Sequence, residues 1–184
     1  NASDYGQSEV QESLVYHFSR RGVEVEASLR IEAARPPGRV SLSLDPGLRL
    51  VAARLGHTPA RWSQTPDGRN ESTRVVVEMP DSSPTSGQIL HLSAWCPLVP
   101  DRPWLLPRIR PIDLFWRGGD ALLLIPGELR LAGLREIDCR QSRLGPFPGA
   151  DDGEAPEFQY FSADSTVEVV LSESRSPVRF DAVT

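Results

Sequence analysis

The sequence contains no lysine, and all 20 of its basic residues are arginine. Arginine codons contain more GC than lysine codons, so this composition indicates a GC-rich genome and a bacterial source. The formal net charge is −5 at pH 7, and the arginines form no basic stripe. Nucleic-acid binding depends on neutralising phosphates, and binding to anionic membrane surfaces depends on basic clusters. The sequence therefore disfavours both kinds of partner.

Long apolar runs are also missing. The longest, residues 121–125, is far shorter than the roughly 20 residues that a membrane-spanning helix needs. We therefore expect no membrane insertion by this segment. The chain starts without a secretion signal, and Asn1 and Ala2 resemble the remnant of a purification tag. We expect that the chain was cut from a longer protein.

Cysteine is scarce: Cys96 and Cys139 are the two in the chain, and neither belongs to a CxxC pair. Two buried free thiols are the preferred interpretation. The alternative is a disulfide that closes a loop of about 43 residues and stabilises the fold by roughly 4 kcal/mol. Pairing would indicate the cell envelope or an extracellular site, which we favour over the cytoplasm.

Recognisable catalytic motifs are absent as well. The histidines His17, His57 and His91 are scattered along the chain without an HExxH pair, so we expect no metal site. No GxSxG elbow and no phosphate-binding glycine loop occurs. We therefore predict that the chain is not an enzyme and needs no cofactor. A hydrolase with dispersed carboxylates stays open as an alternative, because glycosidase carboxylates can lie far apart in sequence.

What the sequence does contain is the alternating pattern of half-buried strands. Over residues 23–33, apolar side chains such as Val23, Val25 and Leu29 alternate with polar ones such as Glu24. A period of two indicates a strand, because successive side chains point to opposite sides of a pleated chain. Similar runs follow at spacings of roughly 8–12 residues, separated by proline and glycine turns. The sequence predicts an all-β fold, namely an antiparallel β-sandwich, with about six or seven strands in its first half.

The chain divides into four regions. Residues 1–13 hold the tag remnant and a frayed N-terminus, and residues 14–96 form the first set of sandwich strands. Residues 97–111 are a proline-rich strap or linker, because proline cannot donate to a sheet ladder. Residues 112–184 are a second β-rich part that either completes the sandwich or forms a small subdomain. Within that part, residues 117–120 (Arg-Gly-Gly-Asp) predict a hairpin turn.

Tryptophan gives the strongest functional signal. Trp104, Trp116 and Trp62 are candidates for a ligand-binding platform, on which a sugar stacks or a partner protein docks. The alternative is that most of the four tryptophans, Trp95 included, anchor the core or the strap.

A family resemblance covers less than half of the chain. Residues 23–97, which contain LDPGLRLVAARLGHTPARWS, RVVVEMP and GQILHLSAWCPL, are similar to the N-terminal β-sandwich of gluzincin aminopeptidases. They resemble accessory sandwich modules of large bacterial envelope proteins equally well. In those enzymes the catalytic zinc motif lies in a separate domain. The resemblance therefore implies an accessory sandwich and carries over no functional residue.

The leading functional hypothesis is a non-catalytic β-sandwich module of a larger bacterial protein, outside the cytoplasm, with an architectural or protein-interaction role. Its partners would be other domains of that protein or a separate protein. A carbohydrate-binding module that uses exposed tryptophans is the first alternative. A hydrolase with dispersed carboxylates is the second.

Overall fold

The fold is all-β, as the alternating pattern predicts. The computed structural model describes residues 8–33, 37–67, 71–80, 87–143 and 153–174. Within these ranges every regular element is a strand. Asn1 and Ala2 lie outside them. None of the described residues forms a helix that could cross a membrane.

The largest sheet contains eight strands in the order β13-β14-β11-β1-β2-β8-β4-β5. The alternation over residues 23–33 becomes β2, one of its central strands. In chain order the bounds are β1 Glu9–Phe18, β2 Gly22–Glu32, β4 Arg49–Leu55, β5 Thr58–Pro59, β8 Gln88–Pro97, β11 Phe115–Leu124, β13 Cys139–Arg143 and β14 Glu157–Tyr160.

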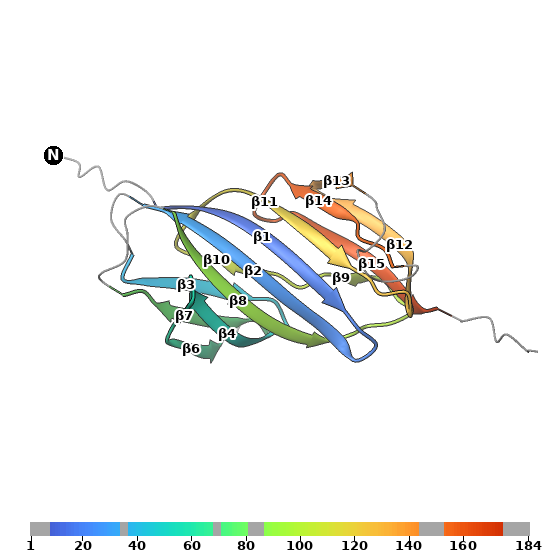
Figure 1. Ribbon diagram of the computed structural model, residues 1–184, viewed down its shortest axis with the longest axis horizontal. Coiled ribbons are helices and arrows are strands. Elements are labelled where there is room, and N and C mark those ends of the chain that lie inside the picture. The colour runs from blue at the N-terminus through green and yellow to red at the C-terminus, as the bar shows by residue number, and fades with distance from the viewer. Residues whose placement is uncertain (1–7, 34–36, 68–70, 81–86, 144–152, 175–184) are drawn as a thin grey trace, which may run out of the picture.

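Two smaller sheets form the second layer of the sandwich. Figure 1 shows β3, β6 and β7 toward one end of the molecule and β9, β12 and β15 toward the other. The four-stranded sheet has the order β10-β3-β7-β6, and the three-stranded sheet has the order β12-β15-β9. Their bounds are β3 Arg39–Leu44, β6 Trp62–Pro66, β7 Thr73–Glu78, β9 Trp104–Leu105, β10 Ile109–Pro111, β12 Leu129–Ile137 and β15 Thr166–Glu173.

The core lies between these two layers. In β1, Leu14, Tyr16 and Phe18 are buried, and Gln11, which points to the other side of the sheet, is exposed. Buried apolar residues from all three sheets form one hydrophobic cluster. The long sheet therefore has one face in the core and one open face that carries its polar side chains.

Strand β1 begins earlier than the sequence predicts. The interpretation of residues 1–13 as frayed is wrong from Glu9 onward, because Glu9 pairs with Glu32 of β2 and with Phe115 of β11. The predicted hairpin at residues 117–120 is also wrong. Those residues lie within β11, which pairs in parallel with β1 from Glu9↔Phe115 to His17↔Leu124, with a shift in register at Arg117. A partner strand about a hundred positions away overrides the local turn preference of Gly118 and Gly119.

The proline-rich segment connects the two smaller sheets. Its β9 pairs with β15 of the three-stranded sheet, and its β10 pairs with β3 of the four-stranded sheet. Leu106, which directly follows β9, and Ile109, the first residue of β10, are both buried. Strands β11, β13 and β14 from the second half of the chain join β1 and β2 in the long sheet. The two halves of the chain therefore share one sheet.

Candidate functional site

The open face of the long sheet carries a row of polar side chains that crosses six strands. Ser13 of β1 lies opposite Asp120 of β11 and Ser28 of β2, and Ser28 lies opposite His91 of β8. Directly opposed residues present their side chains on the same face. Two hydrogen bonds join the row: Ser13 Oγ donates to Asp120 Oδ1 at 2.7 Å, and Ser28 Oγ and His91 Nδ1 are 3.1 Å apart. Gln159 and Arg54 extend it at its two ends.

Four neighbouring hollows, which share lining residues, follow this row. Their volumes are about 630, 370, 260 and 220 Å³. The three larger hollows all have Gln11 in their linings, and the smallest shares Ser28 with the second largest. Together they form a groove across the strands, which we call the open-face groove.

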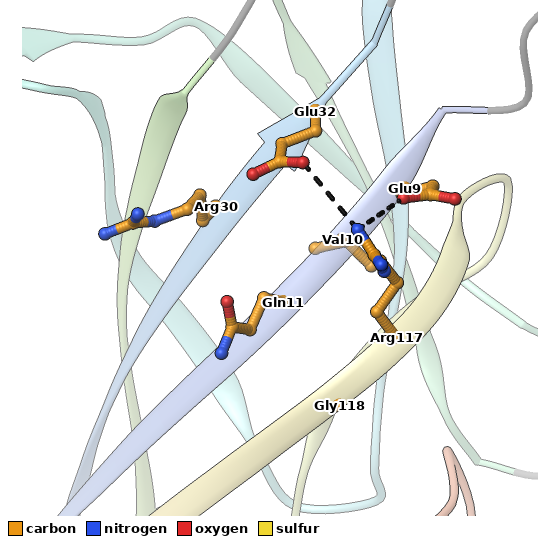
Figure 2. A pocket seen from close by; sticks show the side chains of 7 residues that line it. All are labelled: Glu9, Val10, Gln11, Arg30, Glu32, Arg117 and Gly118. Carbon is orange, nitrogen blue, oxygen red and sulfur yellow. Dashed lines mark ion pairs between the residues drawn. The ribbon is translucent and has the colours of Figure 1, made fainter.

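Arg117 is the charged centre of one of these hollows. Figure 2 shows its guanidinium reaching toward Glu9 and Glu32, with Gln11 and Arg30 lining the other side. Arg117 Nη1 lies 3.0 Å from a carboxylate oxygen of Glu9 and 3.9 Å from one of Glu32. All three side chains are substantially exposed, so these ion pairs contribute about 0–1 kcal/mol. Their effect is to neutralise the charge of the groove locally.

The largest hollow lies where β14 ends beside β11. Strand β14 pairs with β11 from Gly119 to Leu122 and stops at Tyr160. Beyond that point Trp116, Gly118, Gly119 and Phe161 line the hollow, together with polar residues. Phe161 is 59% exposed, which is unusual for a phenylalanine. We call this the β11–β14 hollow.

A buried ion pair lies beneath this end of the sheet. Glu12 of β1 points into the core, where its Oε2 accepts hydrogen bonds from Arg108 Nη2 and, at 3.0 Å, from Trp116 Nε1. Arg108 Nη1 donates to the carbonyl oxygens of Ala163, at 2.9 Å, and Ser165. Both charged side chains are almost completely buried, at 1% and 0% exposure.

Arg108 joins all three sheets. Glu12 belongs to the long sheet, and Ala163 and Ser165 belong to the loop that enters β15 of the three-stranded sheet. The contact with the four-stranded sheet is made by Asp45, which directly follows β3. Its Oδ2 accepts a hydrogen bond from the backbone N–H of Arg108 at 2.9 Å. Its guanidinium also lies 4.5 Å from the centre of the Tyr160 ring, in cation–π geometry.

Burial changes the acidity of this cluster. Loss of solvation raises the pKa of the Glu12 carboxyl, although the charge of Arg108 and the N–H of Trp116 oppose the shift. Burial likewise raises the pKa of Tyr16 and of Tyr160. The hydroxyl of Tyr16 donates to the carbonyl of Pro107 at 3.0 Å. Because Arg108 and Trp116 both bond Oε2 of Glu12 inside the core, out of reach of solvent, this arrangement suits a structural role.

The three tryptophans predicted as ligand-binding residues lie on three different sheets. Trp62 is in β6, Trp104 is in β9 and Trp116 is in β11, and each is partly buried against the core. Of the three, Trp116 lines a hollow of the open-face groove. Trp95, which the sequence did not favour, is 41% exposed.

Both cysteines are free thiols, which is the interpretation that the sequence favours. Their strands, β8 and β13, are five places apart in the order of the long sheet. At about 4.8 Å per place this is roughly 24 Å, far beyond the Cα separation that a disulfide allows. The alternative disulfide is therefore not formed. Burial raises the pKa of the Cys96 thiol to about 11, which does not suit a nucleophile.

The histidines do not assemble a metal centre. His17 lies 3.5 Å from Glu26, and His57 and His91 line one hollow with the same glutamate. Even so, no group of three or more potential ligands close enough to hold a metal ion occurs in the described part of the chain.

Comparison with known proteins shows what the fold resembles. No model of a known protein family matches the chain, and no curated protein matches its sequence. Among solved structures, an M1 zinc metallopeptidase from Deinococcus radiodurans matches 89% of this chain with a TM-score of 0.59 and 15% identity. Yeast LTA4 hydrolase matches 96% of it with a TM-score of 0.56 and 10% identity.

These structural relatives are gluzincin aminopeptidases, so the resemblance of the sequence to their N-terminal sandwich is confirmed in the fold. At such low identity the likeness extends to the fold alone. The chain spans 42% of the length of the Deinococcus metallopeptidase and 31% of that of LTA4 hydrolase. It thus corresponds to one part of a larger protein in each comparison.

Proposed function

We propose that this chain is a non-catalytic β-sandwich module of a larger bacterial, extracytoplasmic protein, with an architectural or protein-interaction role. The observation that carries the proposal is the likeness in fold to 42% of an M1 zinc metallopeptidase chain. A sandwich that matches only part of a larger chain is suited to packing against a second domain. The buried Glu12–Arg108 pair supports this role, because it links the three sheets.

Exposed apolar side chains within and directly after the strap are candidates for that packing. Leu105 in β9 is 50% exposed, and Ile112, directly after β10, is 45% exposed. Covering these side chains with another domain would remove apolar surface from water, which favours docking. We expect the neighbouring domain to cover them.

Amide hydrogen exchange tests the packing. The measurement compares the chain alone with the natural longer protein that contains it. We expect exchange around Leu105 and Ile112 to be slower in the longer protein, and exchange at the open-face residues Ser28 and Arg30 to stay unchanged. Equal exchange rates at Leu105 and Ile112 in the two proteins would contradict docking at the strap.

A turnover assay tests the absence of catalysis. The chain is incubated with Zn²⁺ and amino-acid 4-nitroanilides, and separately with 4-nitrophenyl glycosides, which covers the hydrolase alternative. We expect release of the chromophore at the rate of the buffer alone. Release that rises in proportion to the protein concentration would overturn the proposal.

A further inference from the structure

We propose that the β11–β14 hollow binds a neutral oligosaccharide that stacks on Phe161, with Trp116 packed on the core side of β11 and Gln11, Gln159 and Asp120 as hydrogen-bonding groups. This goes beyond the proposed function, since a module can bind a sugar whether or not it packs against another domain.

The hollow is large enough for a sugar ring, and Gly118 of β11 leaves part of its space open. Its volume is about 630 Å³. A Cβ on Gly118 would meet no atom within 4 Å, so this side of the strand opens directly into the hollow. Gly119 has a different role. A Cβ there would lie 3.1 Å from the carbonyl oxygen and 3.3 Å from the Cβ of Glu12, so glycine lets β11 lie close to β1 at this point.

Both aromatic residues are held in place by the buried cluster. Trp116 is fixed through its indole N–H, which donates to Glu12 at 3.0 Å. Phe161 is fixed through its backbone N–H, which lies 3.2 Å from the carbonyl of Asp138 and 3.1 Å from Ser165 Oγ. Arg108 bonds both Glu12 and Ser165, so one buried side chain supports both positions. An exposed ring on rigid backbone, as Phe161 is, loses little entropy on binding, which favours affinity.

The polar lining matches the hydroxyl groups of a sugar. Gln11 and Gln159 each offer an amide donor and an amide acceptor, and a sugar hydroxyl both donates and accepts. The Asp120 carboxylate is oriented by the 2.7 Å hydrogen bond from Ser13 and retains further acceptor capacity. A flat apolar ring such as that of Phe161 beside such groups suits a pyranose, which has C–H faces and a polar rim.

The charge of the hollow favours a neutral ligand. Asp120 and Glu157 are acidic, and the one basic residue among the described residues of the lining, Arg117, is paired with Glu9 and Glu32. An anionic sugar or a phosphate would therefore meet no unpaired cation in this lining. An extended peptide fits less well, because the part of β11 left unpaired by β14, from Phe115 to Gly118, is short.

Isothermal titration calorimetry with the whole chain tests the proposal. The probes are hexasaccharides of β-1,4-linked glucose, xylose, mannose and N-acetylglucosamine, at millimolar concentration. We expect the chain to bind at least one of them. Phe161→Ala removes a stacking surface and Gly118→Leu fills the hollow, so each should weaken binding about tenfold or more.

Phe115→Ala is the matched control. The exposed fraction of Phe115, 51%, is similar to that of Phe161, but Phe115 does not line the hollow. It should bind the sugar within about twofold of the unmodified chain, a difference well under 1 kcal/mol. Thermal unfolding of all three variants shows whether each is folded at the assay temperature, and Gly118→Leu keeps the test valid if Phe161→Ala unfolds.

Three results would overturn the proposal: none of the four hexasaccharides binds, binding survives both Phe161→Ala and Gly118→Leu, or Phe115→Ala weakens it equally. Binding of extended peptides at the same residues, without sugar binding, would also overturn it and point to a protein partner. None of these results bears on the strap, so failure here is distinguishable from failure of the proposed function.

Discussion

Strand β1 carries glutamates on both of its faces, and the two meet opposite physical conditions. Glu12 points into the core, where it forms a buried ion pair with Arg108. Glu9 forms an exposed ion pair with Arg117 on the open face. Both are arginine–carboxylate pairs. In water the attraction is largely offset by solvation, and in the core the loss of solvation must be balanced by further hydrogen bonds. Burial, and not residue type, decides what each pair contributes.

The comparison also separates structure from recognition. The inward pair connects three sheets and holds Trp116 and the loop around Ser165 in place. The outward pair only adjusts the charge of a solvent-filled groove. We therefore expect substitutions on the inward side to change stability and those on the outward side to change ligand binding.

The largest effect is expected when one member of the buried pair is removed. Glu12→Ala leaves the Arg108 charge buried without its carboxylate and should lower the free energy of unfolding by about 3–5 kcal/mol. Chemical denaturation measures this. The double variant with Arg108→Ala should cost less than the sum of the single variants, because the second change removes the stranded charge. If Glu12→Ala lowers the free energy of unfolding by less than about 1 kcal/mol, the buried pair contributes no more than an exposed ion pair does.

A smaller loss is expected from Tyr16→Phe. The ring stays, but the carbonyl of Pro107 loses the hydroxyl that donates to it at 3.0 Å in the core. An unsatisfied buried acceptor costs roughly 1–3 kcal/mol. Thermal and urea unfolding of the variant measure this cost. Phe18→Leu, another change on the same strand face, distinguishes the loss of the hydrogen bond from altered packing, since it should leave the strap unaffected in hydrogen exchange.

The pH dependence of stability sharpens the comparison further. Because burial raises the folded-state pKa of Glu12 above 4.5, folding favours its protonated form. This contribution is fully present below pH 4.5 and is lost as the pH rises through the folded-state pKa. Glu12→Gln cannot titrate. The difference in the free energy of unfolding between the unmodified chain and Glu12→Gln should therefore fall as the pH rises above 4.5. If this difference increases instead, folding lowers the pKa of Glu12 and does not raise it.

The smallest effect is expected on the open face. Arg117→Ala removes both exposed ion pairs with Glu9 and Glu32 and should change the free energy of unfolding by about 0–1 kcal/mol. Added salt should reduce the difference still more. Urea unfolding at low and high salt measures it. A loss comparable to that of Glu12→Ala would show that the outward pair has a structural role too.

The site could be predicted only in part from the sequence. Glu12 carries a recognisable signal, because it interrupts the apolar positions Val10, Leu14 and Tyr16 on one face of an alternating strand. The signal was missed because that strand was expected to begin at Leu14. Arg108 carries a similar one, as a lone charge between Leu106 and Ile109. A charge on an apolar face indicates a buried partner, but it does not say which residue that partner is.

By itself the sequence determined the all-β class and the position of β2. The alternation of apolar and polar side chains indicates a strand whichever other strands pair with it. It also determined that proline keeps the strap out of the central sheet. Only the tertiary structure decided that β1 and β11 pair in parallel and that Trp62, Trp104 and Trp116 lie on separate sheets. It also decided that Glu12 meets Arg108. These contacts join segments about a hundred residues apart, and they depend on packing against a shared core, which local periodicity does not encode.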